Sequence, residues 1–438
     1  MTSTTTGLDG RVLAAHLPGH VGEPVVIAGW VHRRRLLKSV SFLVLRDRTG
    51  FAQVVLPPSA DLGPFPEETV VEVHGRVVAN EHAPGGTEVV DATVEPLSGP
   101  AVPPPFDLYR PAVDATLPVV LDNAGVALRH PRLRAPFEIA AAAVGGFRAH
   151  LDGLGFTEIH TPKIVGTATE SGANVFAVDW FGRTAYLAQS PQFHKQTMVG
   201  VFERVYEVGP VFRAEPHDTA RHLAQYTSLD AELGFVRDHR DVMVVLTGVL
   251  GAMLAAVRER AGDAVARLGV ALPPEPVQIP EVTFDEAQQL IATNTDGDPR
   301  GEPDLAPADE RWLSGWALRE HGSPFLFVTG YPTVKRPFYT YPDPERPERT
   351  RSFDLLFNGL ELVTGGQRLH YYDDYLAALA ARGEDPAGYA GYLDVFAHGM
   401  PPHGGFAIGL ERFVARLVGA ENIRSTTLFP RDLHRLAP

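Results

Sequence analysis

Short alternating runs of apolar and polar residues dominate the first hundred positions of the chain. Such a period of two is typical of β-strands. The runs lie at 25–32, 41–47, 51–56, 69–79 and 88–94. Turn-forming residues separate them, as at 47–50 and 84–86. Five short strands in so little chain predict a small closed barrel, so we assign residues 1–100 to an all-β domain.

The pattern changes after residue 100. The proline-rich stretch 100–105 and the polar residues that follow fit neither a helix nor a strand, so 101–130 is predicted to be a hinge and 131–438 a second domain. Residues 136–154 have the alanine-rich, amphipathic pattern of a helix, and a strand ending at Pro162 follows. Residues 262–325 are rich in Pro, Asp and Glu, and we interpret them as an insertion whose role the sequence does not reveal.

A later segment, 211–233, combines a strand pattern with charge. An apolar run carries Arg213 and Glu215, a polar loop holds Arg221 and His222, and a second alternating run begins at Tyr226. Two residues that are two positions apart on a strand share a face, so Arg213 and Glu215 could bind an anion and a hydrogen-bond donor side by side, as ATP offers. For this segment alone, an ion-paired surface hairpin is an equal alternative.

The end of the chain separates the two possibilities. Residues 404–416 read GGFAIGLERFVAR, a short glycine-led strand that runs into a helix with Arg412 on its first turn. Phe-Arg-x-Glu at 212–215 followed by Gly-Leu-Glu-Arg at 409–412 resembles motifs 2 and 3 of the class II aminoacyl-tRNA synthetases. The resemblance implies an α+β fold: an N-terminal OB-fold barrel and a catalytic domain with an antiparallel sheet flanked by helices. It also makes 136–162 the counterpart of motif 1, which forms the homodimer interface.

The resemblance implies an ATP site with a magnesium ion. Arg213 would bind the α-phosphate, Glu215 the adenine amino group, and Tyr226 would cover the base. The outer phosphates would meet Arg221, His222 and Arg412, and Arg213 and Arg412 would be the catalytic pair. Asp354 and Glu361 flank an Asn-Gly turn at 358–359. The family places Mg²⁺-binding acids there, although two unrelated strand carboxylates would give the same pattern.

Within the class, the chain resembles the archaeal-type aspartyl-tRNA synthetases. A substrate carboxylate in a closed pocket must be paired, and Lys195 and Arg368 would supply the cations. Asp230 with Gln192 would fix the substrate ammonium group or hold those cations in register. Glu170, in the polar loop 166–172, could also meet the ammonium group.

The barrel carries the expected anticodon contacts. The runs GWVHRRR, SFLVLRD and FAQVV match the family pattern, which assigns anticodon binding to Arg35, Phe42 and Gln53. Residues 36–39 depart from the Asp-Leu-Gly-Gly that is common among relatives. His32 and Pro84 stand where relaxed members of the family carry His and Pro, so we expect aspartate to be attached to both tRNA(Asp) and tRNA(Asn). The alternative is a strict enzyme in which His32 only ends a strand.

The composition excludes several kinds of site and predicts where in the cell the protein lies. The 438 residues carry a formal net charge of −14, which argues against indiscriminate nucleic-acid binding. There is no cysteine, which excludes disulfides, thiolate zinc sites and cysteine nucleophiles. The N-terminal residues lack a signal-peptide pattern, and no uninterrupted apolar run approaches membrane-spanning length, so we expect a cytoplasmic protein.

Three other functions are considered. An asparaginyl-tRNA synthetase shares the architecture but generally lacks the lysine and has glutamate in place of Asp230. An ammonia-dependent asparagine synthetase derived from the same core lacks the barrel, which this chain keeps. A non-enzymatic tRNA-binding paralogue is expected to have lost Arg213, Arg368 or Arg412, and all three are present.

Overall fold

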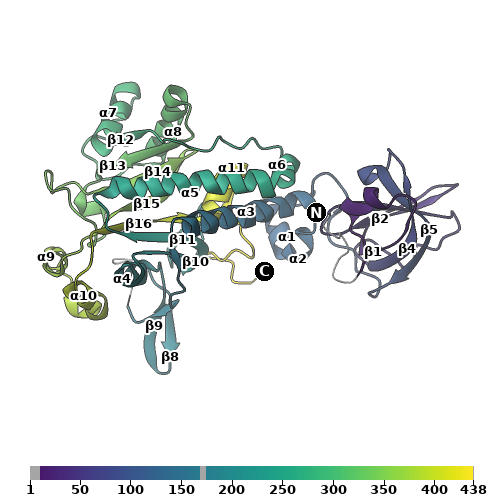
Figure 1. Cartoon of the computed structure of the whole chain (residues 1–438), viewed down its shortest axis with the longest axis horizontal. Coiled ribbons are helices and arrows are strands. Elements are labelled where there is room, and N and C mark those ends of the chain that lie inside the picture. Colours follow the sequence, from purple (N-terminus) through teal and green to yellow (C-terminus); the bar gives the residue numbers. More distant parts are fainter. Residues whose placement is uncertain (1–9, 168–173, 438) are drawn as a thin grey trace. The chain divides into compact units, whose positions relative to one another are not determined.

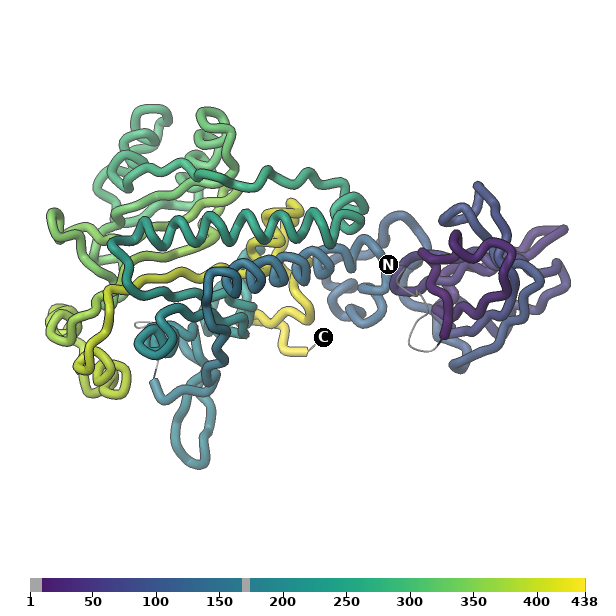
Figure 2. Tube along the Cα trace, in the orientation of Figure 1, coloured from purple at the N-terminus to yellow at the C-terminus, as the bar shows by residue number. Residues whose placement is uncertain are grey.

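The computed structural model describes residues 10–167 and 174–437. The chain divides into two compact units, which we treat separately. One runs through Val120 and includes Gly125–His130, and the other consists of Leu121–Ala124 and the chain from Pro131 onward. Figure 1 labels the elements of each unit, and Figure 2 traces the chain through them.

The first unit is a closed five-stranded barrel with the order β1-β2-β3-β5-β4. Its elements are η1 (Ala14–His20), β1 (Pro24–Leu36), β2 (Ser41–Arg46), β3 (Phe51–Leu56), β4 (Val70–Ala79), η2 (Pro84–Gly86) and β5 (Thr87–Pro96). Alternate residues point inward, and side chains such as Val31, Leu43 and Val54 form a fully buried core. The predicted OB-fold barrel is therefore confirmed, since the period of two places one face of each strand inside.

The second unit is built on a large sheet. Within the described residues it has eight strands in the order β12-β13-β14-β15-β16-β11-β10-β6. They are β6 (Thr157–Glu158), β10 (Arg204–Phe212), β11 (Gln225–Gly234), β12 (Glu281–Thr283), β13 (Phe325–Thr329), β14 (Ser352–Phe357), β15 (Leu360–Gln367) and β16 (His403–Gly409). The pairs from β13 to β10 are antiparallel, and only the edge strands β12 and β6 pair in parallel. The predicted antiparallel sheet is confirmed.

Helices cover this sheet. They are α3 (Pro131–Gly153), α4 (Gln192–Phe202), α5 (His239–Arg260), α6 (Gly262–Leu268), α7 (Phe284–Asn294), α8 (Pro307–His321), α9 (Tyr372–Arg382), α10 (Ala390–Ala397) and α11 (Leu410–Val418). The shorter elements are α1 (Leu117–Asp122), α2 (Ala124–Ala127), η3 (Thr333–Lys335), η4 (Pro386–Tyr389), η5 (Ile423–Thr426) and the small sheet of β7 (Ile164–Val165), β8 (Ala177–Trp180) and β9 (Arg183–Leu187). Figure 1 shows α3 and α5 running side by side across the sheet.

The contact between α3 and α5 depends on a glycine. A Cβ atom added at Gly146 of α3 would lie 2.4 Å from the Ala252 carbonyl oxygen of α5, so only glycine permits this approach. Leu246, Leu250 and Leu254 of α5 are fully buried in the same core. Helix α5 is long and apolar enough to cross a membrane by length and composition alone, which our reading of apolar runs missed. Its buried face identifies it as a core helix.

Two predicted boundaries are wrong. Helix α3 begins at Pro131 rather than Pro136, and Pro136 lies buried inside the helix. Arg213 and Glu215 do not lie on a strand, because β10 ends at Phe212. The Arg213 N–H still donates to the Ala224 carbonyl at 2.9 Å, and Pro216, which has no N–H, lies three residues farther along the chain.

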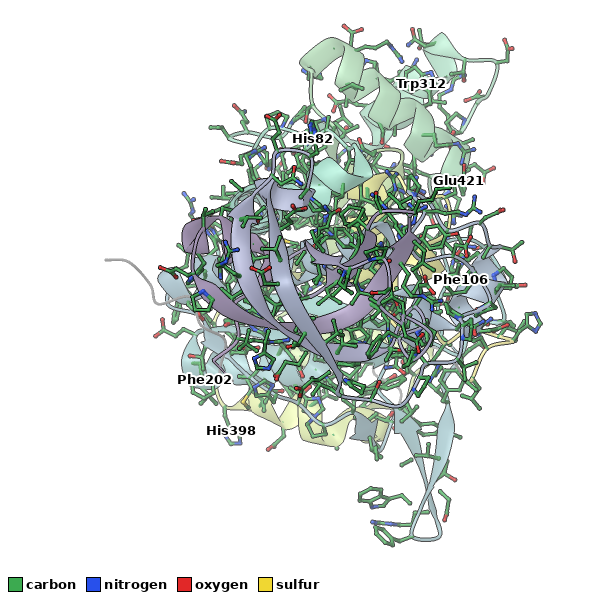
Figure 3. All side chains as sticks on the ribbon, turned by 90° about the vertical axis from the view of Figure 1, so that its right-hand side faces the viewer. His82, Phe106, Phe202, Trp312, His398 and Glu421 are labelled. Atoms are coloured by element: carbon green, nitrogen blue, oxygen red, sulfur yellow. The ribbon has the colours of Figure 1, made fainter. Side chains whose placement is uncertain are left out.

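The segment 262–325 is integrated into the second unit. Strand β12 extends the large sheet, and Trp312 of α8 packs against a core that includes Phe284 of α7 and Leu326 of β13 (Figure 3). The segment therefore contributes to the main sheet, and α8 carries side chains toward the site described next.

Candidate active site

A cavity of about 340 Å³ lies over β11, β15 and β16. We call it the central cavity. All seven residues predicted to bind ATP line it: Arg213, Glu215, Arg221, His222, Tyr226, Glu361 and Arg412. The guanidinium carbon of Arg213 lies 5.6 Å from the centre of the Tyr226 ring, and Arg213 Nη1 lies 4.0 Å from Glu215 Oε1. The structure thus brings together cationic, acidic and aromatic groups suited to a nucleotide.

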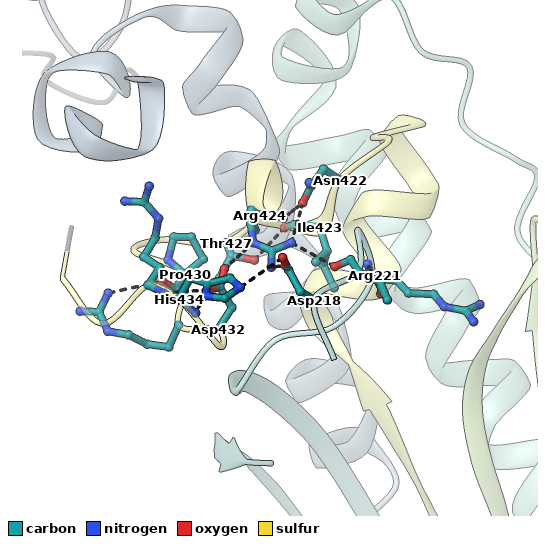
Figure 4. Close-up of polar contacts among 12 residues, drawn as sticks. Asp218, Arg221, Asn422, Ile423, Arg424, Thr427, Pro430, Asp432 and His434 are labelled. Atoms are coloured by element: carbon teal, nitrogen blue, oxygen red, sulfur yellow. Dashed lines mark hydrogen bonds and ion pairs between the residues drawn. The ribbon is translucent and has the colours of Figure 1, made fainter. Parts of the chain in front are cut away.

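The loop that carries Arg221 and His222 is fastened by the C-terminal segment (Figure 4). Arg424 donates from Nη2 to Asp218 Oδ1 at 3.1 Å and from Nη1 to the Thr219 carbonyl at 3.0 Å. The Ile423 N–H also donates to the Ala220 carbonyl at 2.8 Å. These contacts join residues about two hundred positions apart. Sequence reasoning missed Arg424 because nothing local marks it as part of the site.

A buried ionic cluster lies beside the central cavity. Its four members, Lys195, Asp230, Glu232 and Arg368, are all at most 6% exposed, and we call them the cation cluster. Lys195 Nζ donates to Asp230 Oδ1 at 3.0 Å and lies 3.3 Å from Glu232 Oε2. Arg368 Nε donates to Glu232 Oε1 at 2.9 Å. Asp230 therefore lies where it holds a cation in register, the second of its two predicted roles.

Glu232 is the member that sequence reasoning missed. Burial works to raise the pKa of Glu232, but Arg368 and Lys195 outweigh it and hold the pKa below its usual value. A Cβ atom at Gly405 would lie 2.1 Å from Glu232 Oε2, so glycine in β16 leaves room for this carboxylate. The period of two along β11 places Glu232 on the same face as Asp230, which is the signal that could have found it.

The cation cluster and the central cavity are neighbours. Ser228 lines the cavity, and its hydroxyl donates to Asp230 Oδ2. Lys195 Nζ donates to the carbonyl of Phe406 at 3.1 Å, and the next residue, Ala407, also lines the cavity. Lys195 is therefore one contact away from the cavity lining, through Asp230 and through Phe406.

Gln192 and Glu170 complete the predicted amino-acid site. Gln192 starts α4, one turn before Lys195, and is buried. Among the described residues, its Nε2 has no hydrogen-bond partner, so a buried donor is available beside the cation cluster. Glu170 lies outside the described residues.

Asp354 and Glu361 flank the turn as predicted. Asn358 and Gly359 both have positive φ, 46° and 85°, which is the geometry that a two-residue hairpin turn requires. Asp354 is buried and pairs with Arg336 at 2.8 Å. Burial raises the pKa of Asp354 to about 6; Arg336 opposes that shift, and Glu361 adds to it.

These carboxylates fit a magnesium ion that is shared with a substrate. Within the described ranges, no group of three or more His, Cys, Asp or Glu side chains is arranged to hold a metal. Mg²⁺ commonly takes one or two carboxylates together with waters and phosphates, so Asp354 and Glu361 are the residues that would hold it beside a bound nucleotide. Burial and Glu361 disfavour the ionised form of Asp354, and Arg336 is the cation already paired with it.

The barrel presents most of its predicted contacts on one face. Arg35 pairs with Phe42 and Phe42 with Val55 across β1, β2 and β3, and Gln53 lies two residues earlier on β3. Gln53 is more buried than expected and donates to Glu88 Oε2 at 2.9 Å. Pro84 is exposed in η2.

His32 is held in a defined state. Its Nδ1 lies 3.2 Å from Arg46 Nη1, and its ring lies 4.6 Å from that of Phe51. Burial, aided by Arg46, lowers the pKa of His32 to about 4, so the ring is neutral at pH 7. Because arginine only donates, Nδ1 must accept, and the N–H of the neutral ring lies on Nε2. The neutral His32 ring therefore carries one donor, Nε2–H.

Comparison with known proteins agrees with this geometry. The family described as tRNA synthetases class II (D, K and N) matches residues 117–433, and the OB-fold nucleic acid binding domain matches residues 25–97. The aspartate–tRNA(Asp/Asn) ligase of Thermus thermophilus is 48% identical over 429 residues, which cover 98% of this chain and 100% of that protein. The Deinococcus radiodurans protein of the same name is 46% identical, covering 98% and 99%.

Solved structures show the same architecture. The asparaginyl-tRNA synthetase from Pyrococcus horikoshii, complexed with asparaginyl-adenylate, has a TM-score of 0.90 at 30% identity and covers 98% of this chain and 99% of that one. The aspartyl tRNA synthetase from Entamoeba histolytica has a TM-score of 0.85 at 28% identity, covering 98% and 93%. The family predicted from motifs 2 and 3 is confirmed: the chain belongs to the class II aminoacyl-tRNA synthetases of the D, K and N group and carries an OB-fold domain before its catalytic domain.

Proposed function

We propose that this synthetase attaches L-aspartate to tRNA(Asp) and tRNA(Asn) through an aspartyl-adenylate. The observation that carries the proposal is the buried pair Lys195 and Arg368 beside the central cavity. The similar proteins of Thermus thermophilus and Deinococcus radiodurans are named aspartate–tRNA(Asp/Asn) ligases, which supports both the amino acid and the two tRNAs.

In the first step, an oxygen of the aspartate α-carboxylate attacks the α-phosphorus of ATP. The bond from that phosphorus to the bridging oxygen breaks, and pyrophosphate leaves with the electron pair. We assign Arg213 to the α-phosphate and Arg221, His222 and Arg412 to the outer phosphates. Fixed cations of this kind stabilise the charge that develops on phosphoryl oxygens, and no protein nucleophile is required.

Two further groups would position the nucleotide. Glu215 would accept a hydrogen bond from the adenine amino group, and the Tyr226 ring would cover the base. Asp354 and Glu361 would hold Mg²⁺, which neutralises phosphate charge when it is bound. In the second step, a terminal ribose hydroxyl of the tRNA attacks the adenylate carbonyl carbon and AMP leaves.

Selection of aspartate over asparagine follows from hydrogen-bond chemistry. Lysine and arginine have only donors, whereas an ionised carboxylate has only acceptors, so the two match. The amide nitrogen of asparagine would place its own donors against these groups. Asp230 and Glu232, the acceptors of the cation cluster, are already paired with the cations. Glu170 and the amide oxygen of Gln192 are assigned to the substrate ammonium group, which only donates hydrogen bonds.

Amino-acid-dependent pyrophosphate exchange tests this proposal. We expect kcat/KM for aspartate to exceed that for asparagine by roughly 10⁴-fold, the size of rejection that an unmatched polar site produces. A preference for asparagine would instead identify an asparaginyl-tRNA synthetase, the name of the similar Pyrococcus horikoshii protein.

The barrel is assigned to the anticodon, whose last base is C in tRNA(Asp) and U in tRNA(Asn). Arg35, Phe42 and Gln53 would bind the anticodon by charge, stacking and hydrogen bonding. The Nε2–H of His32 is a single donor, and both pyrimidines carry the O2 acceptor. Pro84 has no N–H of its own with which to favour one base. These two residues therefore support relaxed choice between the two tRNAs.

We propose a cytoplasmic homodimer. Three large apolar side chains gather beside edge strand β6, at 38%, 44% and 68% exposure: Leu154, Phe202 and Phe235 (Figure 3 labels Phe202). Hydrogen bonds of Arg204 to the Leu154 carbonyl and of Gly234 to the Glu203 carbonyl, both 2.8 Å, keep this surface together. Exposed apolar surface next to an unpaired strand edge is typical of an interface.

Light scattering is expected to give twice the chain mass of 47.5 kDa. Phe235→Asp is expected to shift the mass toward the monomer, because it would bury a charge in the interface. A wild-type protein that is fully active as a monomer would contradict the homodimer.

A further inference from the structure

A second cavity, also of about 340 Å³, adjoins the central cavity. The two share Arg221, Arg412 and Ile423 in their linings. The second cavity adds Arg311 from α8 and Arg416 from α11, so four arginines line it. We call it the arginine cavity.

The positive charge of this cavity is poorly compensated. Across residues 10–167 and 174–437, none of the four arginines forms an ion pair within 4.0 Å, and Arg412 Nη1 donates instead to the Glu361 carbonyl at 2.9 Å. Glu421 is the one acidic residue in the lining, and Glu310 lies nearby on α8 with an oxygen that accepts the Glu361 N–H at 2.9 Å. In a chain of net charge −14, so concentrated a positive region needs a separate explanation.

The arginines also destabilise one another. Burial lowers the pKa of Arg416, and the charges of Arg221 and Arg412 lower it further. Arg416 is half-buried, so solvent screens its contact with an anion less than it would at an exposed position. The charge of the cavity is therefore complementary to a ligand that carries several negative charges.

We propose that the arginine cavity binds inorganic pyrophosphate, the leaving group of the first step, at a position outside the ATP site. The inference rests on the proposed function, in which Arg221 and Arg412 already contact the outer phosphates of ATP. Since the same two side chains line both cavities, pyrophosphate can exchange one set of arginine contacts for another as it departs. Arg311 and Arg416 then serve the released product rather than the bound nucleotide.

The test is the dissociation constant of inorganic pyrophosphate, titrated calorimetrically into the full-length protein with Mg²⁺. Arg311→Gln and Arg416→Gln are each expected to weaken binding by about tenfold, the effect of losing one charge-assisted contact. Arg311 is exposed, so that variant should fold even if Arg416→Gln does not. Arg319→Gln, an exposed position on the same helix α8, is the matched control and should change binding by less than twofold.

Three results would overturn the proposal. Pyrophosphate affinity unchanged in both variants would show that the cavity does not bind it. A rise in KM for ATP as large as the loss of pyrophosphate affinity in the same variants would place Arg311 and Arg416 in the ATP site itself. A rise in KM for tRNA with unchanged pyrophosphate affinity would assign the surface to the nucleic-acid backbone. Pyrophosphate titration needs no amino acid, so normal binding without aspartate-dependent exchange would refute only the proposed function.

Discussion

Replacing Lys195 with methionine is expected to lower kcat/KM for aspartate in pyrophosphate exchange by roughly 10⁴-fold, with little change in KM for ATP. The cation cluster holds two cations and two carboxylates. Without Lys195 the cluster has one cation and two carboxylates. The resulting net negative charge repels the carboxylate of the substrate side chain. Lys195→Glu should be at least as severe, since it adds a third buried carboxylate.

Loss of a buried lysine also endangers folding, so a matched control is needed. Lys163 Nζ pairs at 2.8 Å with the buried Glu207, which lies opposite Asp230 on β10, but Lys163 itself is not a member of the cation cluster. Lys163→Met removes a lysine from a buried carboxylate in the same way and should retain aspartate activation. If Lys195→Met kept exchange within a few-fold of wild type while remaining folded, Lys195 would not be the aspartate-binding cation.

Arg213→Gln is expected to reduce the rate of adenylate formation by about 10³-fold or more, a loss of the order produced by removing an arginine from phosphoryl transfer. Arg213 is assigned to the phosphate at which bonds form and break, so the loss should appear mainly in kcat. Single-turnover formation of aspartyl-adenylate measures it without interference from later steps.

Arg237→Gln is the control for this variant. Arg237 pairs with Asp241 at a fully solvated position, where an ion pair contributes little. A single-turnover rate for Arg213→Gln within tenfold of wild type would remove Arg213 from the catalytic role. An unchanged rate with a raised KM for ATP would make it a ground-state binding residue.

The fold was largely predictable where its determinants are local. The barrel strands follow from a period of two and from turn residues at fixed places, as at 84–86. The start of α3 was missed because Pro136 reads as a helix beginning, although the surrounding packing tolerates it in the interior. The contribution of 262–325 to the main sheet depends on the pairing of β12 with β13, which is set by tertiary contacts.

The residues of the site also divide into those that local sequence predicts and those that depend on distant partners. Residues within motifs 2 and 3 were predictable because short stretches fix their spacing, and the seven predicted ATP-binding residues line one cavity. Arg424 and Glu310 were missed because their partners lie far away in the sequence. The tautomer of His32 likewise depends on Arg46, a residue on another strand whose guanidinium group fixes which ring nitrogen accepts.

The central claim concerns which tRNAs receive aspartate, and aminoacylation of purified tRNA(Asp) and tRNA(Asn) tests it directly. A single neutral donor on His32 and a proline at 84 give the barrel little means of separating cytosine from uracil. We therefore expect the two kcat/KM values for aspartylation to agree within about tenfold, equivalent to ~1.4 kcal/mol. A preference for tRNA(Asp) of about a hundredfold or more would contradict relaxed specificity. That ratio corresponds to ~2.7 kcal/mol, which is within the ~1–3 kcal/mol that one mismatched base commonly costs.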